Sequence, residues 1–366
     1  MGLERLSETE SHSVYACFAF INTAGPLGGG VTGSLLYHMI RLLQSYHNII
    51  SCENLLTSWQ EFIRGKRKRP DVQAFAINLP DRIFELHAEL LQRTYCHGPY
   101  THFRISDPKP RDIHKASVRD RLLHHAIYRV LYPFFDRKFV SDSFSCREEK
   151  GTHKAMDRFR SFSYQVSKNH TRTCWILKCD IRKFFATVDH TTLLNILAST
   201  IPASDILWLL REIVDSFNSG TAGKGLPLGN LTSQLFVNIY MNEFDQFVKH
   251  KLKVKYYIRY ADDFVILSED KTVLEDLLQE IRQFLSQRLH LKLHPDKVFI
   301  KTLASGLDFL GWVHFPDHRV LRRATKRRML ARVNQNNLSS YLGLCKHGNT
   351  YKLRKERLTK ELLWLQ

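Results

Sequence analysis

Two adjacent carboxylates, Asp262 and Asp263, are the residues of this sequence whose type and spacing best suit chemistry. Aromatic and β-branched residues flank them on both sides, which predicts two short strands joined by a tight hairpin turn. Adjacent negative charges repel each other, so the pair makes sense mainly with a neutralising cation, and hard carboxylate oxygens suit Mg²⁺. A two-metal phosphoryl-transfer site needs a further carboxylate, and Asp180, at the end of the apolar run 175–177, is the best candidate. The alternative is a solvated turn, where aspartate pairs are common.

The charge of the chain favours a polyanionic partner. The 366 residues carry a net charge of +18, and the pI is near 9.6. Nucleic acid is the simplest partner for such a charge, and a basic surface that only solubilises the protein is the alternative. The length allows two or three modules and a large core.

Cysteine usage and the N-terminal region argue against several other classes. The seven cysteines are scattered without a Cys-x-x-Cys pair, which argues against a zinc site or a disulfide framework and predicts a reducing, cytoplasmic location. Residues 13–43 are fairly apolar, but Pro26, a run of glycines, His38 and Arg41 interrupt them, so no membrane span is expected. No Gly-Lys-Ser/Thr follows the glycines, so they do not form a phosphate-binding loop.

The elements expected around the carboxylates form an α+β layer, with helices packed on an antiparallel sheet. Apolar residues at helical spacing predict helices within 52–92, after Ser117, from about 190, from 204, from after Gln234 to about 250, and at 274–285. Strands are expected at 103–105, at a partner strand reached through the turn at 108–113, at the run that ends at Asp180, at the hairpin and at 291–293. This order brings the end of the Asp180 strand beside the hairpin.

In this order, the motifs resemble those of the reverse transcriptase palm. Asp180–Phe185 is similar to the first metal-binding motif of that family, Tyr260–Asp263 to the second, and Phe309–Trp312 to the primer-grip turn. The resemblance implies a right-hand polymerase with a ferredoxin-like antiparallel palm sheet. It also implies this division of the chain: an N-terminal extension of unknown role at 1–50, fingers with part of the palm at 51–170, the palm at 171–311, and a short basic helical thumb at 312–366.

The resemblance further implies which residues act. Asp180, Asp262 and Asp263 would be catalytic and, with the Ile181 carbonyl, would hold two Mg²⁺, with Mn²⁺ as a substitute. The partners would be dNTPs, a template RNA and the RNA/cDNA duplex. The expected nucleotide-binding residues are Lys109, Arg111, Phe185, Leu228, Gly229, Gln234 and Lys297. The expected primer grip is Phe309, Leu310 and Gly311, and the expected contacts to the nucleic-acid backbone are Arg322, Arg323, Lys326, Arg327 and Arg328.

Three of these residues have distinct expected roles. The planar guanidinium of Arg111 suits triphosphate oxygens, and Lys297 would be a proton donor to the leaving pyrophosphate. Phe185 matches the ring that blocks a ribose 2′-hydroxyl in this family, which predicts use of dNTPs over rNTPs. The alternatives are an ordinary surface arginine, a structural lysine and a core aromatic residue.

The segment from Leu228 to Gln234 resembles the reverse transcriptases of diversity-generating retroelements. Most reverse transcriptases have a glutamine before the glycine and a proline after the serine, whereas that group has an aliphatic residue and a glutamine, as here. Residues 151–154 and 346–351 also look like that group, while Ala261 stands where methionine is more common. Loss of a polar contact at Leu228 would weaken base discrimination and raise misincorporation. The resemblance implies that these errors occur at template adenines, during mutagenic retrohoming. A small basic oligomeric accessory protein is the implied partner.

Two alternatives stay open. One is a domesticated antiphage-defence or group II intron-like reverse transcriptase, and the other is a non-catalytic RNA-binding scaffold. Three intact aspartates argue against the scaffold, because a scaffold has no need of converging carboxylates.

Overall fold

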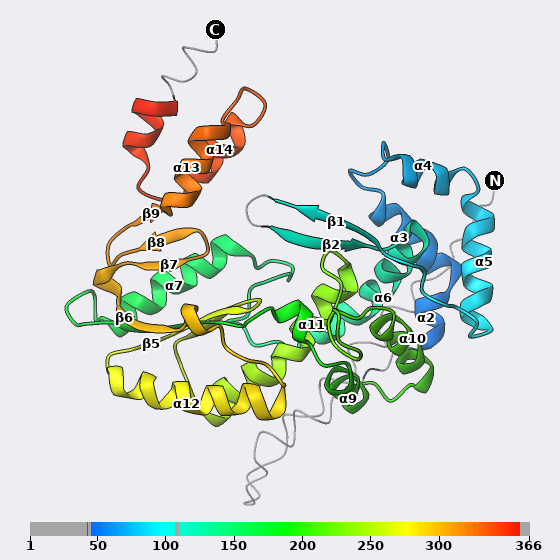
Figure 1. Cartoon of the computed structure of the whole chain (residues 1–366), viewed down its shortest axis with the longest axis horizontal. Helices are drawn as coiled ribbons and strands as arrows, with labels where there is room; N and C mark the ends of the chain where they lie inside the picture. Colours follow the sequence, from blue (N-terminus) through cyan, green and yellow to red (C-terminus); the bar gives the residue numbers. More distant parts are fainter. Residues whose placement is uncertain (1–41, 43–44, 107–109, 359–366) are drawn as a thin grey trace, which may run out of the picture. The chain divides into compact units, whose positions relative to one another are not determined.

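The computed structural model describes residues 42, 45–106 and 110–358 (Figure 1). The chain divides into two compact units, residues 1–40 and 41–366, and the first lies outside the described residues, as does most of the expected N-terminal extension. Helix α2 (Tyr46–Ile50), however, buries Tyr46, Ile49 and Ile50 in the core of the second unit. The folded core therefore begins before residue 51.

The first part of the second unit is a group of helices with a two-stranded ribbon. The helices are α3 (Cys52–Phe62), α4 (Pro70–Ala76), α5 (Leu79–Leu91) and α6 (Val118–Asp136), and the ribbon pairs β1 (Thr101–Ile105) with β2 (Arg111–Lys115) in antiparallel register. Ser51 and Ser117 cap α3 and α6, because each side-chain oxygen accepts a backbone N–H from the first turn. The apolar face of α6 is fully buried at Leu122, Leu123 and Ile127.

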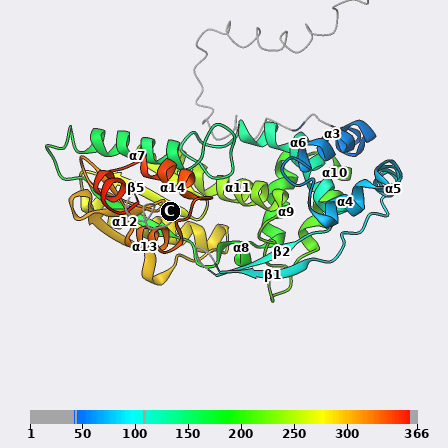
Figure 2. The same cartoon turned by 90° about the horizontal axis from the view of Figure 1, so that it is seen from above.

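The central sheet has four antiparallel strands in the order β4-β5-β3-β6. These are β3 (Trp175–Asp180), β4 (Tyr257–Tyr260), β5 (Asp263–Ser268) and β6 (Phe299–Thr302). Helices α12 (Lys271–Arg288) and α7 (Thr152–Val166) cover its opposite faces (Figures 1 and 2). Alternate residues along β3 enter different cores, since Leu177 packs with α12 and Ile176 packs with α7.

The strand predicted at 291–293 is wrong. Leu293 forms only an isolated bridge to Ile181, and the fourth strand of the sheet is β6, further along the chain. A 3-10 turn, Pro295–Lys297, separates the two segments. Proline lacks a backbone N–H for a ladder, so pairing stops at this turn and resumes after it.

Most of the remaining helices pack against one another and against α6. They are α8 (Phe184–Thr187), α9 (His190–Thr200), α10 (Ser204–Asp215) and α11 (Leu231–Gln246), which continues into a π-helical turn, Phe247–Lys251. Helix α11 is buried along nearly all of its length and packs against α6 and α9. Among the described residues, none of the helices has the length and apolar character needed to cross a lipid bilayer.

The C-terminal part begins with strands before its helices. Strands β7 (Leu307–Phe309), β8 (Trp312–His314) and β9 (Arg319–Leu321) form a three-stranded antiparallel sheet. Helices α13 (Arg323–Arg332) and α14 (Leu338–Cys345) and a last turn, Leu353–Leu358, follow. The segment expected to be helical from residue 312 is therefore extended up to Leu321, because residues 312–314 pair with β7 and residues 319–321 pair with β8.

Candidate active site

Three aspartates meet where the two central strands of the sheet end. Asp180, the last residue of β3, lies opposite Asp263, the first residue of β5, in the antiparallel register. Tyr260 pairs with Asp263, so Ala261 and Asp262 form the loop of the hairpin. The Ile181 backbone N–H donates to the Asp262 carbonyl over 3.1 Å, which ties the loop to the end of β3. The structure thus brings together the carboxylates that the sequence predicts to converge.

The hairpin loop holds an alanine in a conformation that suits glycine. Ala261 has a φ of 57°, in the left-handed region, which costs an L-residue on the order of 1 kcal/mol. The Arg259 guanidinium donates from Nη1 to the Ala261 carbonyl over 3.1 Å. A tertiary hydrogen bond therefore supports a turn that its own residues do not favour.

Arg259 belongs to a buried network behind the hairpin. Its side chain and that of Asp245, on α11, are both fully buried, and Nε and Nη2 donate to the carboxylate over 2.8 and 2.7 Å. The Tyr257 hydroxyl donates to the same carboxylate over 2.6 Å, and Arg259 Nη2 also donates to Ser143 Oγ over 2.9 Å. Sequence reasoning missed this network. An arginine among aromatic and aliphatic strand residues does not by itself reveal that it will be buried.

Two lysines supply positive charge to the aspartates. Lys297 Nζ lies 3.0 and 3.1 Å from the two oxygens of Asp180, and Lys178 Nζ lies 3.2 Å from Asp263. Lys178 also donates to the Asp308 carbonyl over 2.7 Å, so it connects the carboxylate site to β7. Sequence reasoning assigned no role to Lys178, although it lies two residues before Asp180 and so points to the same face of β3.

Burial and repulsion between carboxylates raise the pKa of Asp262 and of Asp263. Burial raises the pKa of Asp263 to about 6, with Lys178 opposing the rise and the other aspartates adding to it. Burial and the charge of Asp180 raise the pKa of Asp262, while Lys297 and Arg111 oppose this shift. A cation at this site would relieve both effects.

The donor set suits a hard divalent cation. Within the described part of the chain, Asp263 Oδ1 is a buried oxygen without a hydrogen-bond partner, and such an atom is costly unless a cation or water completes its shell. No three His, Cys, Asp or Glu side chains of the described residues are arranged as a metal-ligand set, and the two lysine ammonium groups contact the carboxylates instead. Among the described residues, the unpartnered oxygen of Asp263, and not a preformed ligand set, makes Asp180, Asp262 and Asp263 the residues that could hold Mg²⁺.

Replacing Asp263 with asparagine is expected to stabilise the metal-free protein near pH 7. The pKa of Asp263 in the folded protein, about 6, lies above its ordinary value of 3.8. Protonated Asp263 therefore favours the folded state fully below pH 3.8, and this contribution to stability is lost as the pH rises through about 6. This loss corresponds to an upper limit of about 3 kcal/mol in the free energy of unfolding. Urea unfolding in a chelator at pH 4 and pH 7 checks this, with the exposed Asp276→Asn as control. An Asp263→Asn variant less stable than wild type at pH 7 would contradict the argument.

Arg111 of β2 and the loop that carries Leu228 and Gly229 lie against each other, and both bear expected nucleotide-binding residues. Arg111 is exposed at the start of β2, and its charge acts on Asp262. The Leu228 carbonyl accepts the His114 backbone N–H over 3.3 Å, and Asn230 Nδ2 donates to the His114 carbonyl over 3.1 Å. These bonds hold the 228–230 loop against β2. Lys109 lies outside the described residues.

Gly229 occupies a position that a side chain would disturb. Its φ is 108°, and an added Cβ would lie 3.2 Å from Ile113 Cγ2 on β2. Phe185 is half-buried on α8, and its carbonyl accepts the Leu226 N–H over 2.7 Å, which connects α8 to the same loop. Gln234 is half-buried in the first turn of α11.

The expected primer-grip turn is the β7–β8 hairpin. Phe309 is fully buried against Phe159, and Leu310 and Gly311 both have positive φ, as a tight turn requires. Lys178 lies 5.7 Å from the centre of the Phe309 ring, so it contacts this hairpin as well as Asp263. The hairpin and the carboxylates are therefore connected by one lysine.

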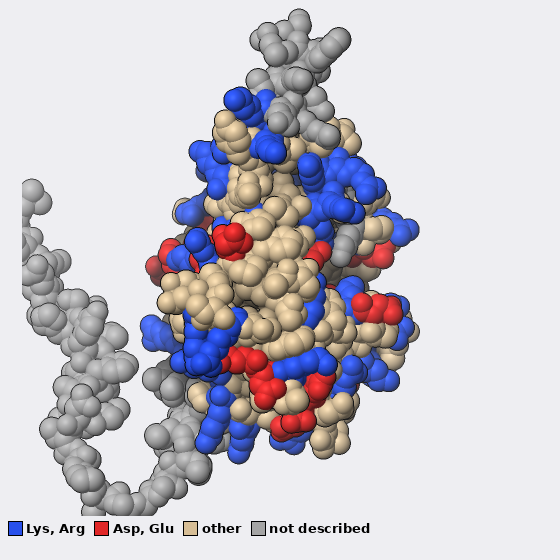
Figure 3. Space-filling model, turned by 90° about the vertical axis from the view of Figure 1, so that its left-hand side faces the viewer, with Lys and Arg blue, Asp and Glu red and all other residues tan. Residues whose placement is uncertain are grey.

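The basic residues of the C-terminal helices differ in their surroundings. Arg322 Nε donates to Asp308 over 2.8 Å, so its charge is engaged within the protein. Arg323, Lys326 and Arg327 are exposed on α13, and Arg328 is half-buried there. Figure 3 shows that lysine and arginine side chains prevail over the upper part of the surface, where these helices lie.

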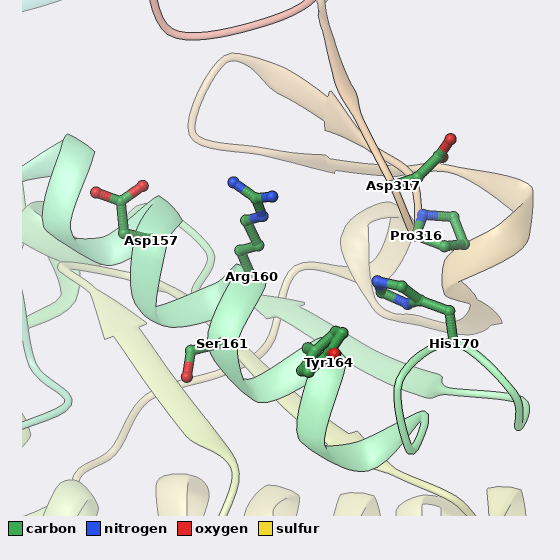
Figure 4. A pocket seen from close by; sticks show the side chains of 7 residues that line it. All are labelled: Asp157, Arg160, Ser161, Tyr164, His170, Pro316 and Asp317. Atoms are coloured by element: carbon green, nitrogen blue, oxygen red, sulfur yellow. The ribbon is translucent and has the colours of Figure 1, made fainter.

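A separate depression lies between α7 and the β8–β9 loop, with a cavity volume of about 640 Å³. Asp157, Arg160 and Tyr164 of α7 line it together with His170 and Asp317, as Figure 4 shows. Its lining mixes both charges and includes none of the three aspartates. The depression is therefore distinct from the carboxylate site.

Carboxylates that converge at a strand end and a hairpin, beside basic residues, are the arrangement expected of a nucleotidyl-transfer site of the polymerase type. Residues 106–314, more than half of the chain, match the family model described as "Reverse transcriptase (RNA-dependent DNA polymerase)". The chain belongs to this family, and the matched domain is that of an RNA-directed DNA polymerase.

Several proteins are similar to this chain. The Escherichia coli K12 protein YkfC is 27% identical over 281 residues, which cover 66% of this chain and 71% of YkfC. The group II intron-encoded protein LtrA of Lactococcus lactis subsp. cremoris is 21% identical over 318 residues, which cover 68% of this chain and 51% of LtrA. Thus the chain spans about half the length of LtrA. A telomerase structure from Candida tropicalis has a TM-score of 0.47 at 13% identity, covering 63% of this chain and 55% of that one.

Proposed function

We propose that this protein copies a template RNA into cDNA by two-metal phosphoryl transfer, with errors concentrated at template adenines, as the polymerase of a diversity-generating retroelement. The observation that carries the chemistry is the register of the sheet, which places Asp180 opposite Asp263 with Asp262 in the adjoining loop. The sequence pattern from Leu228 to Gln234 supports the retroelement assignment.

The residues of the site would share the work as follows. Asp180, Asp262, Asp263 and the Ile181 carbonyl would hold two Mg²⁺, or Mn²⁺, whose chemistry is to activate the primer 3′-hydroxyl and to hold the triphosphate. Arg111, which lies on the β1–β2 ribbon, would bind the oxygens of the triphosphate. Lys297, now paired with Asp180, would serve the leaving pyrophosphate as proton donor. Positioning and charge neutralisation then supply most of the rate.

The duplex would be held by the C-terminal helices. We refer to α13 and α14 as the thumb, and its exposed Arg323, Lys326 and Arg327, with Arg328, would follow the phosphates of the template and the growing cDNA. The primer would rest on Phe309, Leu310 and Gly311. A small basic oligomeric accessory protein is the proposed partner in priming and selective mutagenesis.

Leu228 is the proposed source of the errors. The hydrogen bond from His114 fixes its backbone against β2, while its half-buried side chain is aliphatic and offers no donor or acceptor to a base or a sugar. A site that lacks such a polar contact discriminates weakly between correct and incorrect nucleotides. On this proposal, Leu228 would lie beside the nucleotide with no side-chain donor or acceptor to offer it.

Primer extension tests this assignment. Purified protein, with its accessory partner where one is needed, should copy an RNA template with Mg²⁺ and dNTPs, and the errors in the sequenced cDNA should concentrate at adenines. Leu228→Gln should lower the adenine error rate about 2- to 10-fold, the value of one added hydrogen bond. Leu228→Met is the matched control and should keep the errors. Equal fidelity at all four bases, together with no effect of Leu228→Gln, would remove the retroelement assignment.

Phe185→Ala is expected to reduce the preference for dNTPs over rNTPs about 10- to 100-fold, because the ring no longer fills the space of the 2′-hydroxyl. The measurement is the ratio of kcat/KM for a dNTP and the matching rNTP. Phe185→Tyr keeps the ring and should keep the preference. If Phe185→Ala discriminates against ribonucleotides to the same extent as wild type, Phe185 is only a core residue.

The similarity to LtrA favours one alternative, a group II intron-like or antiphage-defence reverse transcriptase. Accurate cDNA in the same assay would support that alternative and keep the polymerase. A non-catalytic RNA-binding scaffold would instead bind RNA without metal-dependent synthesis.

A further inference from the structure

Two sequence segments without an assigned function, 151–154 and 346–351, meet in the structure. The imidazole rings of His153 and His347 stack with their centres 3.7 Å apart and an angle of 27° between planes. One residue earlier, Thr152 Oγ1 donates to the hydroxyl of Tyr260 over 3.1 Å. Tyr260 directly precedes the Ala261-Asp262 loop. The first turn of α7 therefore contacts both the catalytic hairpin and the turn that follows α14.

The turn that carries His347 is firmly docked on the β7–β9 sheet. The His347 carbonyl accepts Arg319 Nε, and the Asn349 N–H donates to the Arg319 carbonyl over 2.8 Å. An added Cβ at Gly348 would lie 2.1 Å from the Trp312 ring, so the turn approaches this ring as only glycine can. His347 is therefore held between the β7–β9 sheet and the end of α14, which finishes two residues earlier at Cys345.

The first half of α7 packs against the thumb as well. Met156 is fully buried in a small core with Trp312, Met329 of α13 and Cys345 of α14. Arg319 Nη1 lies 3.7 Å from Asp157. Hence α7 is a direct physical connection between the helices proposed to hold the duplex and the hairpin that carries Asp262 and Asp263.

We propose that Thr152 and His153 are positioning residues that couple the docked thumb to the catalytic hairpin. The His153–His347 stack fixes the start of α7 when the thumb is in place, and the Thr152 hydroxyl then fixes the Tyr260 ring beside the carboxylates. This inference rests on the polymerase activity and does not depend on the retroelement assignment. Neither residue is assigned a contact with substrate.

A double-mutant cycle on the full chain tests the coupling. Thr152→Val removes the hydroxyl at nearly constant volume and should lower kcat for nucleotide addition about 2- to 10-fold, with little change in KM for the primer-template. His347→Ala should lower kcat by a similar factor and shorten the products made in one binding event. The double variant should have the kcat of the lower single variant, since coupled residues do not act additively.

Matched variants separate positioning from stability. Thr152→Ser keeps the hydroxyl and His347→Phe keeps a stacking ring, so both should retain the wild-type kcat. His318→Ala removes a histidine that stacks on Phe315, with ring centres 4.8 Å apart, and should leave kcat unchanged. Thermal unfolding of each variant shows whether the compared proteins are equally folded.

Two results would overturn the coupling. One is multiplication of the two kcat effects in the double variant, which is the behaviour of independent sites. The other is a kcat in His347→Phe as low as in His347→Ala. Both results are interpretable only when the wild-type enzyme is active. A wild-type protein without metal-dependent synthesis would instead refute the polymerase assignment.

Discussion

Replacing Asp262 with asparagine is expected to lower kcat for nucleotide addition by about 10³-fold or more, because a metal-bound carboxylate contributes several kcal/mol of transition-state stabilisation. The substitution removes one charge and keeps the shape of the side chain. Burial and the charge of Asp180 already make this ionised carboxylate costly in the folded protein. The variant should therefore be at least as thermally stable as wild type while it is inactive.

The measurement is single-nucleotide addition to an RNA-templated primer in Mg²⁺, beside thermal unfolding in a chelator. Asp317→Asn, at an exposed aspartate of the β8–β9 loop, should keep full activity. Activity of Asp262→Asn within tenfold of wild type would show that this carboxylate does not hold a catalytic ion. Loss of both activity and stability would show that Asp262 has a structural role that the hairpin geometry does not reveal.

The hairpin and the strand that ends at Asp180 could be predicted from sequence, because their signals are local. Alternating β-branched and aromatic residues specify strands, and small or acidic residues specify the turn. The pairing of Asp180 with Asp263 then follows from the antiparallel order of the elements. The family motifs lie on these same elements, so the candidate carboxylates were the most predictable part of the site.

The supporting residues could not be predicted in the same way, because their partners are distant in sequence. Arg259 depends on Asp245 from α11 and Ser143 from a loop, and no local pattern marks an arginine that will be buried in a strand. The exchange of residues 291–293 for β6 has a similar cause. Residues 291–293 alternate apolar and polar side chains, whereas Phe299–Thr302 do not, so the local pattern favours the first segment; only the turn at Pro295 and the pairing with β3 select the second.

The site therefore has two energetically costly features, its buried carboxylates and its left-handed turn, and Arg259 stabilises the turn. Asp262 and Asp263 are reluctant to ionise, and Ala261 has a left-handed backbone. The Arg259 guanidinium holds the loop from behind through the Ala261 carbonyl. A strained turn persists only where the surrounding structure holds it in place. Here the buried Arg259–Asp245 ion pair does so, because Arg259 also donates to the Ala261 carbonyl.

Removal of the Asp245 carboxylate is expected to have the largest effect on stability. Asp245→Ala leaves the Arg259 charge buried without its counter-ion and takes an acceptor from Tyr257, so the free energy of unfolding should fall by about 3–5 kcal/mol. Domains of this kind are stable by only about 5–15 kcal/mol, so the substitution removes a large share of the stability and should lower the thermal midpoint. Urea unfolding with wild type as reference measures the loss.

The double variant Asp245→Leu/Arg259→Met separates the stability of this pair from its effect on the hairpin. Because no charge is left in the core, it should regain most of the stability that Asp245→Ala loses. Its kcat should stay about 10-fold or more below wild type, because the Ala261 carbonyl has lost its donor and the strained loop is free to relax away from the geometry that the carboxylates need. A double variant that regains wild-type kcat along with stability would reduce Arg259 to a core residue. One that regains neither would indicate that Ser143 and Tyr257 cannot repack around apolar side chains, and that the network acts as a unit.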